Sequence, residues 1–195
     1  MDAVEERKIV ESMREALRRS RGHASFFEWA ADRDLEEWGV ADHFRESLEK
    51  RGEPAFSQLI SRGRGNDPPD CEAVGPNGEL IAIEVTELVD PRAIVAYKAK
   101  KFYDWSDWTR EQLQAALHLR LKAKAAKRPN LKGGPFAQYT VLIYTDEPML
   151  PYLHATNLLS GLRFSDSAKI DRAVLLISYD PAVGYCPYTE LRCDA

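Results

Sequence analysis

A turn at residues 75–78 constrains the fold of the surrounding chain more than any other stretch of the sequence. Its sequence, Gly-Pro-Asn-Gly, lies between two short apolar runs and matches a three-residue hairpin loop, whose last residue adopts a positive φ and is usually glycine. The proline pre-sets the first turn angle, and Gly78 takes the positive φ without steric cost. The sequence therefore predicts two antiparallel strands, at about residues 70–75 and 79–88.

The register of this hairpin brings two acidic residues together. If Gly75 faces Glu79, facing residue numbers add to 154, and Asp70 then lies directly across from Glu84. Facing Cβ atoms are about 5 Å apart, and two carboxylates at that distance repel each other unless a proton or a cation lies between them. Glu84 also interrupts an apolar strand, where an unpaired carboxylate is costly to bury. Oxygen ligands of this kind suit a hard cation such as Mg²⁺ or Mn²⁺.

Other periodic segments extend the hairpin into a mixed α/β pattern. Helices are expected at about residues 5–19, 35–51, 109–127 and 152–162, and further strands at about 55–61, 138–144 and 173–179. From residue 35 the order of elements is α-β-β-β-α-β, followed by α-β. This order predicts an α/β fold, with a mixed β-sheet flanked by helices.

The composition is that of a globular protein, with 44% apolar and 30% charged residues in a chain of 195. The apolar runs are too short to span a bilayer, and residues 1–6 lack the basic start and apolar stretch of a signal peptide. The three cysteines, Cys71, Cys186 and Cys193, form no zinc-type CxxC pattern. We therefore expect a cytoplasmic protein without a membrane segment, in a reducing compartment.

The acidic pair belongs to a longer motif. Pro69-Asp70, thirteen intervening residues and then Glu84-Val85-Thr86 resemble the PD-(D/E)XK signature of the restriction-endonuclease-like nucleases. The order α-β-β-β-α-β also resembles the core of that superfamily. The resemblance implies that Asp70, Glu84 and the carbonyl of Val85 hold Mg²⁺ (or Mn²⁺), and that the chain hydrolyses phosphodiester bonds of DNA.

The motif departs from the family pattern at Thr86, where most members have a lysine. Some members of the superfamily carry that lysine on the following helix, which here is expected at residues 109–127. At 100° per residue, Lys124 falls about 20° from the apolar residue Leu113, whereas Lys122 falls on the opposite, solvent side. The catalytic residues implied by the resemblance and the helix phase are Asp70, Glu84, Thr86 and Lys124. Glu37, on the apolar face of the helix at 35–51, is a further candidate carboxylate.

Charge is unevenly distributed along the chain. The net charge is −4, which does not suggest a general nucleic-acid binder, but residues 92–134 contain eleven basic and three acidic side chains. Basic residues interleaved with aromatic ones suit phosphate contacts and base stacking. A solvated helix face explains the basic segment equally well, and Trp105 and Trp108 are alternatively anchors of the core. The residues expected to contact nucleic acid are Arg62, Arg64, Arg120, Lys122, Lys127 and Lys132.

A chain of this length fits a single domain, residues 1–195, and the resemblance, which covers about residues 35–145, implies a restriction-endonuclease-like fold. Residues 1–34 would form an N-terminal helical extension, residues 35–145 the nuclease-like core, and residues 146–195 a C-terminal helix and strand that complete the sheet. We expect nucleic acid, and DNA before RNA, as the partner. A homodimer is compatible with the sequence.

Two other classes of function are alternatives to a Mg²⁺-dependent nuclease. Thr86 at the lysine position favours a catalytically inactive nuclease-fold protein that binds nucleic acid or another protein. A serine or cysteine hydrolase has little support, because the sequence has no Gly-x-Ser-x-Gly motif and its four histidines are scattered.

Overall fold

The computed structural model describes residues 33–101, 103–165 and 167–194. The helix expected at residues 5–19, and with it most of the expected N-terminal extension, lies outside the described residues.

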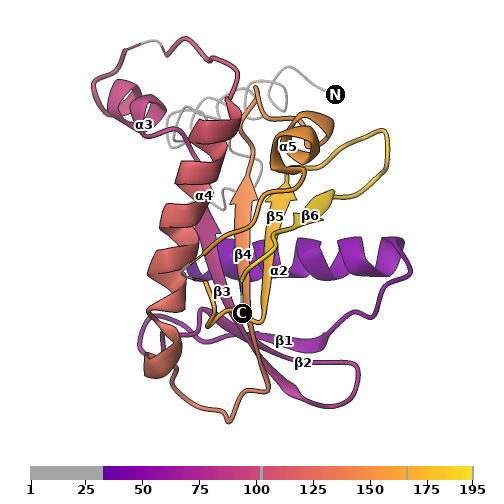
Figure 1. Cartoon of the computed structure of the whole chain (residues 1–195). Helices are drawn as coiled ribbons and strands as arrows, with labels where there is room; N and C mark the ends of the chain where they lie inside the picture. The colour runs from indigo at the N-terminus through magenta and orange to yellow at the C-terminus, as the bar shows by residue number, and fades with distance from the viewer. Residues whose placement is uncertain (1–32, 102, 166, 195) are drawn as a thin grey trace, which may run out of the picture.

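A six-stranded mixed sheet forms the centre of the described chain (Figure 1), with its strands in sequence order. The pairs β3–β4 and β4–β5 are parallel, and the other neighbouring pairs are antiparallel. The α/β class and the helix-flanked mixed sheet are thus confirmed. The strands are β1 (Ser57–Ser61), β2 (Cys71–Val74), β3 (Leu80–Glu87), β4 (Gln138–Thr145), β5 (Arg172–Ile177) and β6 (Tyr188–Glu190).

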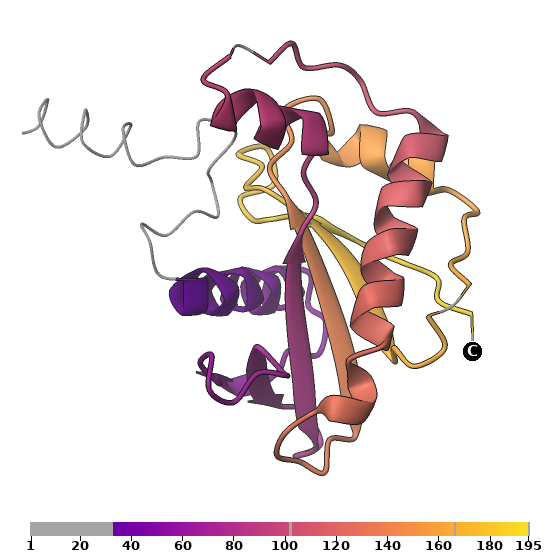
Figure 2. The same cartoon turned by 90° about the vertical axis from the view of Figure 1, so that its left-hand side faces the viewer.

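Helices cover both faces of the sheet. Helix α2 (Arg33–Lys50) crosses one face, and α4 (Arg110–Ala125) and α5 (Tyr152–Leu159) lie on the other (Figure 2). Helix α4 connects β3 to β4, and α5 connects β4 to β5, so each parallel pair is joined by a helical crossover, as parallel strands require. A short 3₁₀ turn, η1 (Arg128–Asn130), follows α4.

The alternation of side chains along β3 divides its residues between two apolar clusters. Ile81, Ile83 and Val85 pack in the cluster beneath α2. Ala82 and Leu88 pack in the cluster beneath α4 and α5. Glu84 has the same parity as Ala82, and its side chain therefore lies on the α4 side of the sheet.

The predicted hairpin register is confirmed. The facing pairs run from Cys71 with Ile83 to Val74 with Leu80, and each pair of numbers adds to 154. The turn is closed by the amide of Gly75, which donates to the carbonyl of Glu79 at 2.8 Å, and Gly78 has a φ of 83°. Beyond the last pair, the same register places position 70 opposite position 84.

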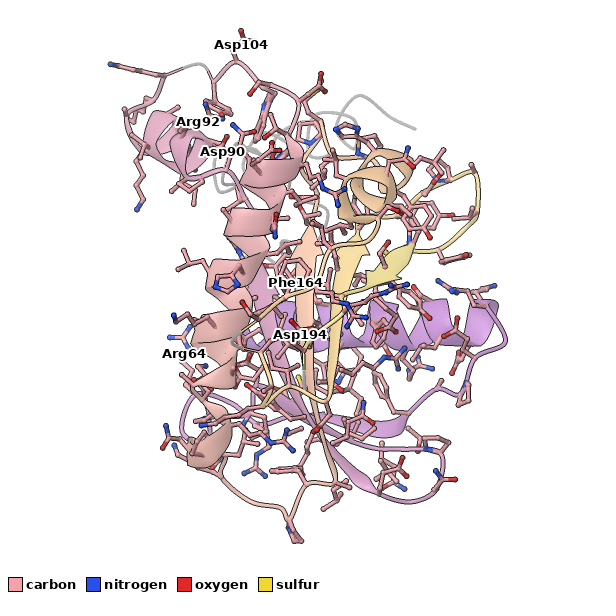
Figure 3. The ribbon with its side chains drawn as sticks, in the orientation of Figure 1. Arg64, Asp90, Arg92, Asp104, Phe164 and Asp194 are labelled. Atoms are coloured by element: carbon pink, nitrogen blue, oxygen red, sulfur yellow. The ribbon has the colours of Figure 1, made fainter. Side chains whose placement is uncertain are left out.

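Two elements were not predicted from the sequence: the strand β6 and the helix α3 (Pro91–Lys98). The carboxylate of Asp90 caps α3 by accepting from the amide of Arg92 at 2.8 Å, and Pro91 occupies the first turn. Asp90 and Arg92 lie beside each other at the start of this helix (Figure 3). The first part of the basic segment, residues 92–98, is therefore helical.

The segment that contains α3 is fastened at both ends to one buried side chain. Glu147 accepts a hydrogen bond from the amide of Asp90 at 2.6 Å and another from the indole of Trp108 at 3.4 Å. Trp108 is 8% exposed and belongs to the cluster beneath α4. Of the two roles considered for this tryptophan, the structure therefore supports the core anchor. Among the described residues, no helix is both long and apolar enough to cross a bilayer.

A candidate metal centre beside the hairpin

Asp70 immediately precedes β2, and its carboxylate lies against the neighbouring strand. Its side chain is 2% exposed, and Oδ2 accepts a hydrogen bond from the backbone amide of Val85 at 2.7 Å. This bond bridges the open end of the β2–β3 ladder and fixes the carboxylate beside Glu84. The face-to-face arrangement expected from the register is the one observed.

Glu84 is fully buried in the middle of β3. Its Oε2 accepts hydrogen bonds from the ammonium groups of Lys124 and Lys127, the latter at 2.9 Å. Its Oε1 is enclosed and has no hydrogen-bond partner among the described residues. Burial raises the pKa of Glu84, the charge of Lys124 opposes that rise, and the charge of Asp70 adds to it. The net effect is a raised pKa, so the site disfavours a second negative charge unless a cation is close.

Lys124 occupies the inward position that the helix phase predicts. Helix α4 begins with a capping box between Thr109 and Gln112, and its apolar stripe is buried against the sheet. The Lys124 ammonium lies 3.3 Å from Asp70 Oδ2 and also contacts Glu84. The hydroxyl of Tyr139, on β4, donates to the Lys124 carbonyl at 2.8 Å and so ties this end of the helix to the sheet.

Asp67 and Lys127 also belong to the site, although the sequence analysis gave neither of them this role. Oxygen atoms of Asp67, Asp70 and Glu84 lie within 4.8 Å of one another. Lys127 lies between two of these acids, with its ammonium 3.5 Å from Asp67 Oδ1. Burial lowers the pKa of Lys127, but its hydrogen bond to Glu84 and the nearby acidic charges outweigh burial and raise the pKa overall.

The donor set is appropriate for a hard divalent cation. All three candidate ligands are carboxylates, and Mg²⁺ and Mn²⁺ prefer oxygen donors. The Oε1 of Glu84 is an acceptor that the described part of the chain leaves unsatisfied, which is costly for a buried oxygen unless a ligand fills the position. Two ammonium groups against three carboxylates leave a net charge of −1, so the cluster still attracts a cation.

A pocket of about 350 Å³ adjoins the acidic cluster, between the start of α2 and the loop at residues 62–69. Glu37 lies in this pocket, where burial and the charge of Asp70 raise its pKa despite an ion pair with Arg33 at 2.6 Å. The candidate carboxylate Glu37 is therefore close to the site and electrostatically coupled to it. The pocket is lined by Arg33, Asp34, Glu37, Gly63, Arg64, Asp67 and Asp70.

The other residues of the sequence-predicted motif have separate roles. Thr86 is half-buried, and by strand alternation it shares the face of Glu84. The side chain of Val85 belongs to the core beneath α2, and its amide is the donor to Asp70. Its carbonyl as a metal ligand stays a prediction.

Two of the arginines expected to contact nucleic acid are hydrogen-bonded to the protein. Arg120 donates to the carbonyl of Glu87, the last residue of β3, at 2.6 Å and to that of Val89 at 3.4 Å. Arg62 pairs with Glu72 at 2.9 Å, within the hairpin region. These contacts give both guanidinium groups a structural role in the strands that carry the site.

The remaining basic residues of that set are more accessible. Lys122 and Arg64 are exposed, and Arg64 lines the acidic pocket. Lys132 is exposed as well, with its ammonium 3.3 Å from the carbonyl of Gly65. The loop that precedes Asp70 and the segment that follows α4 therefore lie side by side next to the site.

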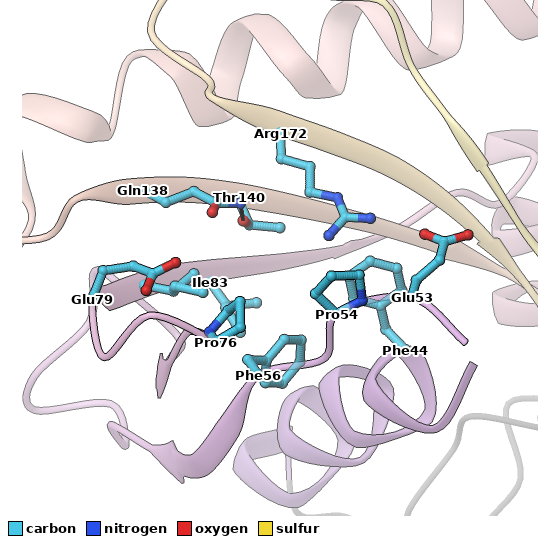
Figure 4. Close-up of a pocket in the computed structure, with 11 residues that line it drawn as sticks. Phe44, Glu53, Pro54, Phe56, Pro76, Glu79, Ile83, Gln138, Thr140 and Arg172 are labelled. Atoms are coloured by element: carbon cyan, nitrogen blue, oxygen red, sulfur yellow. Dashed lines mark hydrogen bonds between the residues drawn. The ribbon is translucent and has the colours of Figure 1, made fainter. Parts of the chain in front are cut away.

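A second pocket, of about 230 Å³, lies on the α2 side of the sheet (Figure 4). Its most prominent polar group is Arg172, which is paired with Glu190 at 2.6 Å and packs over the ring of Phe44 at 5.0 Å. This pocket shares no residue with the acidic cluster, and its arginine already has protein partners.

No protein-family model, no curated protein and no solved structure matches this chain.

Proposed function

We propose that this chain is a nuclease that uses Mg²⁺ or Mn²⁺ to hydrolyse phosphodiester bonds of DNA. The observation that carries the proposal is the enclosed Oε1 of Glu84, which has no partner within residues 33–101, 103–165 and 167–194, while Asp70 lies opposite and Lys124 lies alongside. The element order supports it as well, because α2, β1, β2, β3, α4 and β4 follow the α-β-β-β-α-β order that the motif implies, with α3 inserted.

Asp70 and Glu84 would hold the ion, with the Val85 carbonyl as the resemblance implies and Asp67 within reach of both carboxylates. A bound divalent cation supplies Lewis-acid polarisation of a phosphodiester and a bound water of lowered pKa. The chain's own contribution is preorganisation. The amide of Val85 fixes Asp70, and α4 fixes the Lys124 ammonium as a positive charge beside the two acids, where it can orient water or offset charge on phosphorus.

The accessible cations Arg64, Lys122 and Lys132 are our candidates for phosphate contacts. They lie on the loop before Asp70, on α4 and just after α4, which are the elements that surround the site. Phosphate contacts of this kind hold a nucleic acid without reading its sequence. The choice of DNA follows from the family resemblance.

A second candidate function is a catalytically inactive nuclease-fold module that binds nucleic acid or protein. The specific observation in its favour is that Lys124 and Lys127 both contact Glu84 already, so the protein compensates this charge in part by itself. Thr86 at the position of the usual lysine points the same way.

The Glu84→Gln variant separates these functions, because it removes the charge and keeps the shape of the side chain. We expect it to fold, to lose binding of Mg²⁺ and Mn²⁺ in calorimetry, and to lose metal-dependent DNA cleavage. Glu79→Gln is the matched control, since it removes the same charge from the turn of the same hairpin, away from the site. Cleavage that persists in Glu84→Gln would contradict the proposal, and absence of ion binding in the wild type would leave the inactive module.

A further inference from the structure

Two ammonium groups share a single oxygen, Glu84 Oε2, but they are held differently. Lys124 is on the last turn of α4, its side chain is 10% exposed, and it contacts both Asp70 and Glu84. Lys127 follows the end of that helix, and its side chain is 36% exposed. Lys124 is therefore enclosed between the helix and the sheet, whereas Lys127 has a path to solvent.

Lys127 also occupies the space between two candidate ligands. Its ammonium is 2.9 Å from Glu84 Oε2 and 3.5 Å from Asp67 Oδ1. Asp67 is 40% exposed, and its carboxylate comes within 4.8 Å of those of Asp70 and Glu84. An ion held by all three carboxylates would lie within a few ångströms of the Lys127 ammonium, and two positive charges at that separation repel each other strongly in a site of low dielectric.

We propose that Lys127 is an exchangeable counter-ion: its ammonium neutralises Glu84 and Asp67 in the metal-free protein and leaves them when a divalent cation binds, with Asp67 becoming the third carboxylate ligand. This inference rests on the proposed metal centre and adds to it a side chain, Lys127, that changes position when the ion binds. Lys124 stays in place because its contacts with both buried acids are enclosed, and Lys127 turns outward toward solvent.

This exchange has a consequence for substrate binding. An ammonium that has left Glu84 lies on the segment just after α4, which also carries the exposed cation Lys132. There it is available for a phosphate group, as the sequence analysis expects of Lys127. The observed ion pair and the expected phosphate contact would then be two positions of one side chain, and the ion would determine which position is occupied.

Two measurements on the full chain test the exchange. Calorimetry with MgCl₂ and with MnCl₂ compares the wild type with Lys127→Met and with Lys98→Met, a control that removes the same charge from the exposed last turn of α3. We expect Lys127→Met to bind the ions at least tenfold more tightly, because no ammonium has to be displaced, and Lys98→Met to remain within about threefold of the wild type. Mass spectrometry follows the acetylation rates of the individual lysines with and without Mn²⁺. We expect the rate at Lys127 to rise severalfold on addition of the ion, while Lys124, which experiences the same added charge, stays protected.

The outcomes distinguish this inference from the proposed function. If the wild type binds Mn²⁺ but the acetylation of Lys127 does not change, or if the two methionine variants bind the ion equally, the exchange is wrong and the metal centre stands. If neither the wild type nor Lys127→Met binds either ion, the metal centre itself is wrong and both ideas fail. If only Lys127→Met binds the ions, Lys127 is a counter-ion that the natural chain does not release, which overturns the exchange and supports the inactive module.

Discussion

The contact between Lys124 and the two buried acids predicts a large, cation-dependent loss of stability when its charge is removed. In Lys124→Met the side chain keeps its length against the sheet, but Asp70 and Glu84 lose the ammonium that both of them contact. Removing one partner of a buried ion pair costs about 3–5 kcal/mol, because the remaining charge stays buried. Lys127 still contacts Glu84, so we expect the lower end of that range.

The corresponding assay is thermal unfolding in the presence of a chelator. For a domain of this size, each kcal/mol changes Tm by about 2–4 °C, so a loss of about 3 kcal/mol lowers Tm by roughly 6–12 °C. Lys122→Met is the matched control, because a substitution on the exposed face of the same helix changes stability by about 0.5 kcal/mol or less. Added Mg²⁺ should then restore much of the loss, since an ion at a hundred times its Kd stabilises the folded state by about 2.7 kcal/mol.

Two results would refute this reasoning. If Lys124→Met unfolds in chelator at the wild-type temperature, Lys124 does not compensate the buried acids in solution. The second result is a destabilised Lys124→Met whose Tm rises on addition of Mg²⁺ no more than that of Glu84→Gln. In that case Asp70 and Glu84 do not bind an ion, and Lys124 has a purely structural role.

Two further predictions concern residues around the site. Arg120→Met should lower the free energy of unfolding by about 2–3 kcal/mol, measured in urea, because the carbonyls of Glu87 and Val89 lose a charged donor. If the variant instead has wild-type stability and binds DNA more weakly, Arg120 is a nucleic-acid contact. Burial raises the pKa of Asp90, but hydrogen bonds from Arg92 and Tyr103 outweigh it and lower the pKa to about 2, from 3.8. Because the pKa of Asp90 is lowered on folding, the ionised carboxylate stabilises the folded state at neutral pH. This stabilisation is lost as the pH falls from about 4 to about 2. Asp90→Asn, which keeps a capping side chain, should therefore be roughly 1–2 kcal/mol less stable than the wild type at pH 6, with the difference shrinking toward pH 2 in unfolding experiments across that range; a constant difference would mean that the charge of Asp90 contributes nothing.

The parts of the site that could be predicted are those that depend on regular local geometry. A turn with glycine at a fixed position determines the register of its hairpin, and the register alone placed Asp70 opposite Glu84. A helix of 100° per residue with a clear apolar stripe determines which side chains face inward, and this placed Lys124 toward the acids and Lys122 toward solvent. In both cases one short-range rule decides a contact between residues far apart in sequence.

Other parts depend on contacts that no short-range rule specifies. Asp67 reaches the site from a loop whose path is determined by its tertiary environment. Lys127 was assigned to nucleic acid because it is basic, although its position three residues after Lys124 already places both on one side of the chain. The role of Arg120 depends on carbonyl groups that end a strand more than thirty positions earlier.

The two elements that the sequence analysis did not predict are short. Helix α3 has eight residues, too few for a clear periodic pattern, but Asp90 followed by Pro91 is a start signal that was present in the sequence. Strand β6 has three residues and is formed by pairing with β5, so its own sequence carries little information about it.

Glu147 separates the chain between Asp90 and Trp108 from the sheet and from α4 more than the order of elements alone suggests. The carboxylate of Glu147 accepts a hydrogen bond from Asp90 at the start of this segment and another from Trp108 at its end. The two ends of the segment are therefore held close together. We therefore expect the length and composition of this segment to be changeable without altering the register of β3 against β4 or the position of Lys124 on α4. Chains with the same sheet could then carry quite different segments at this point.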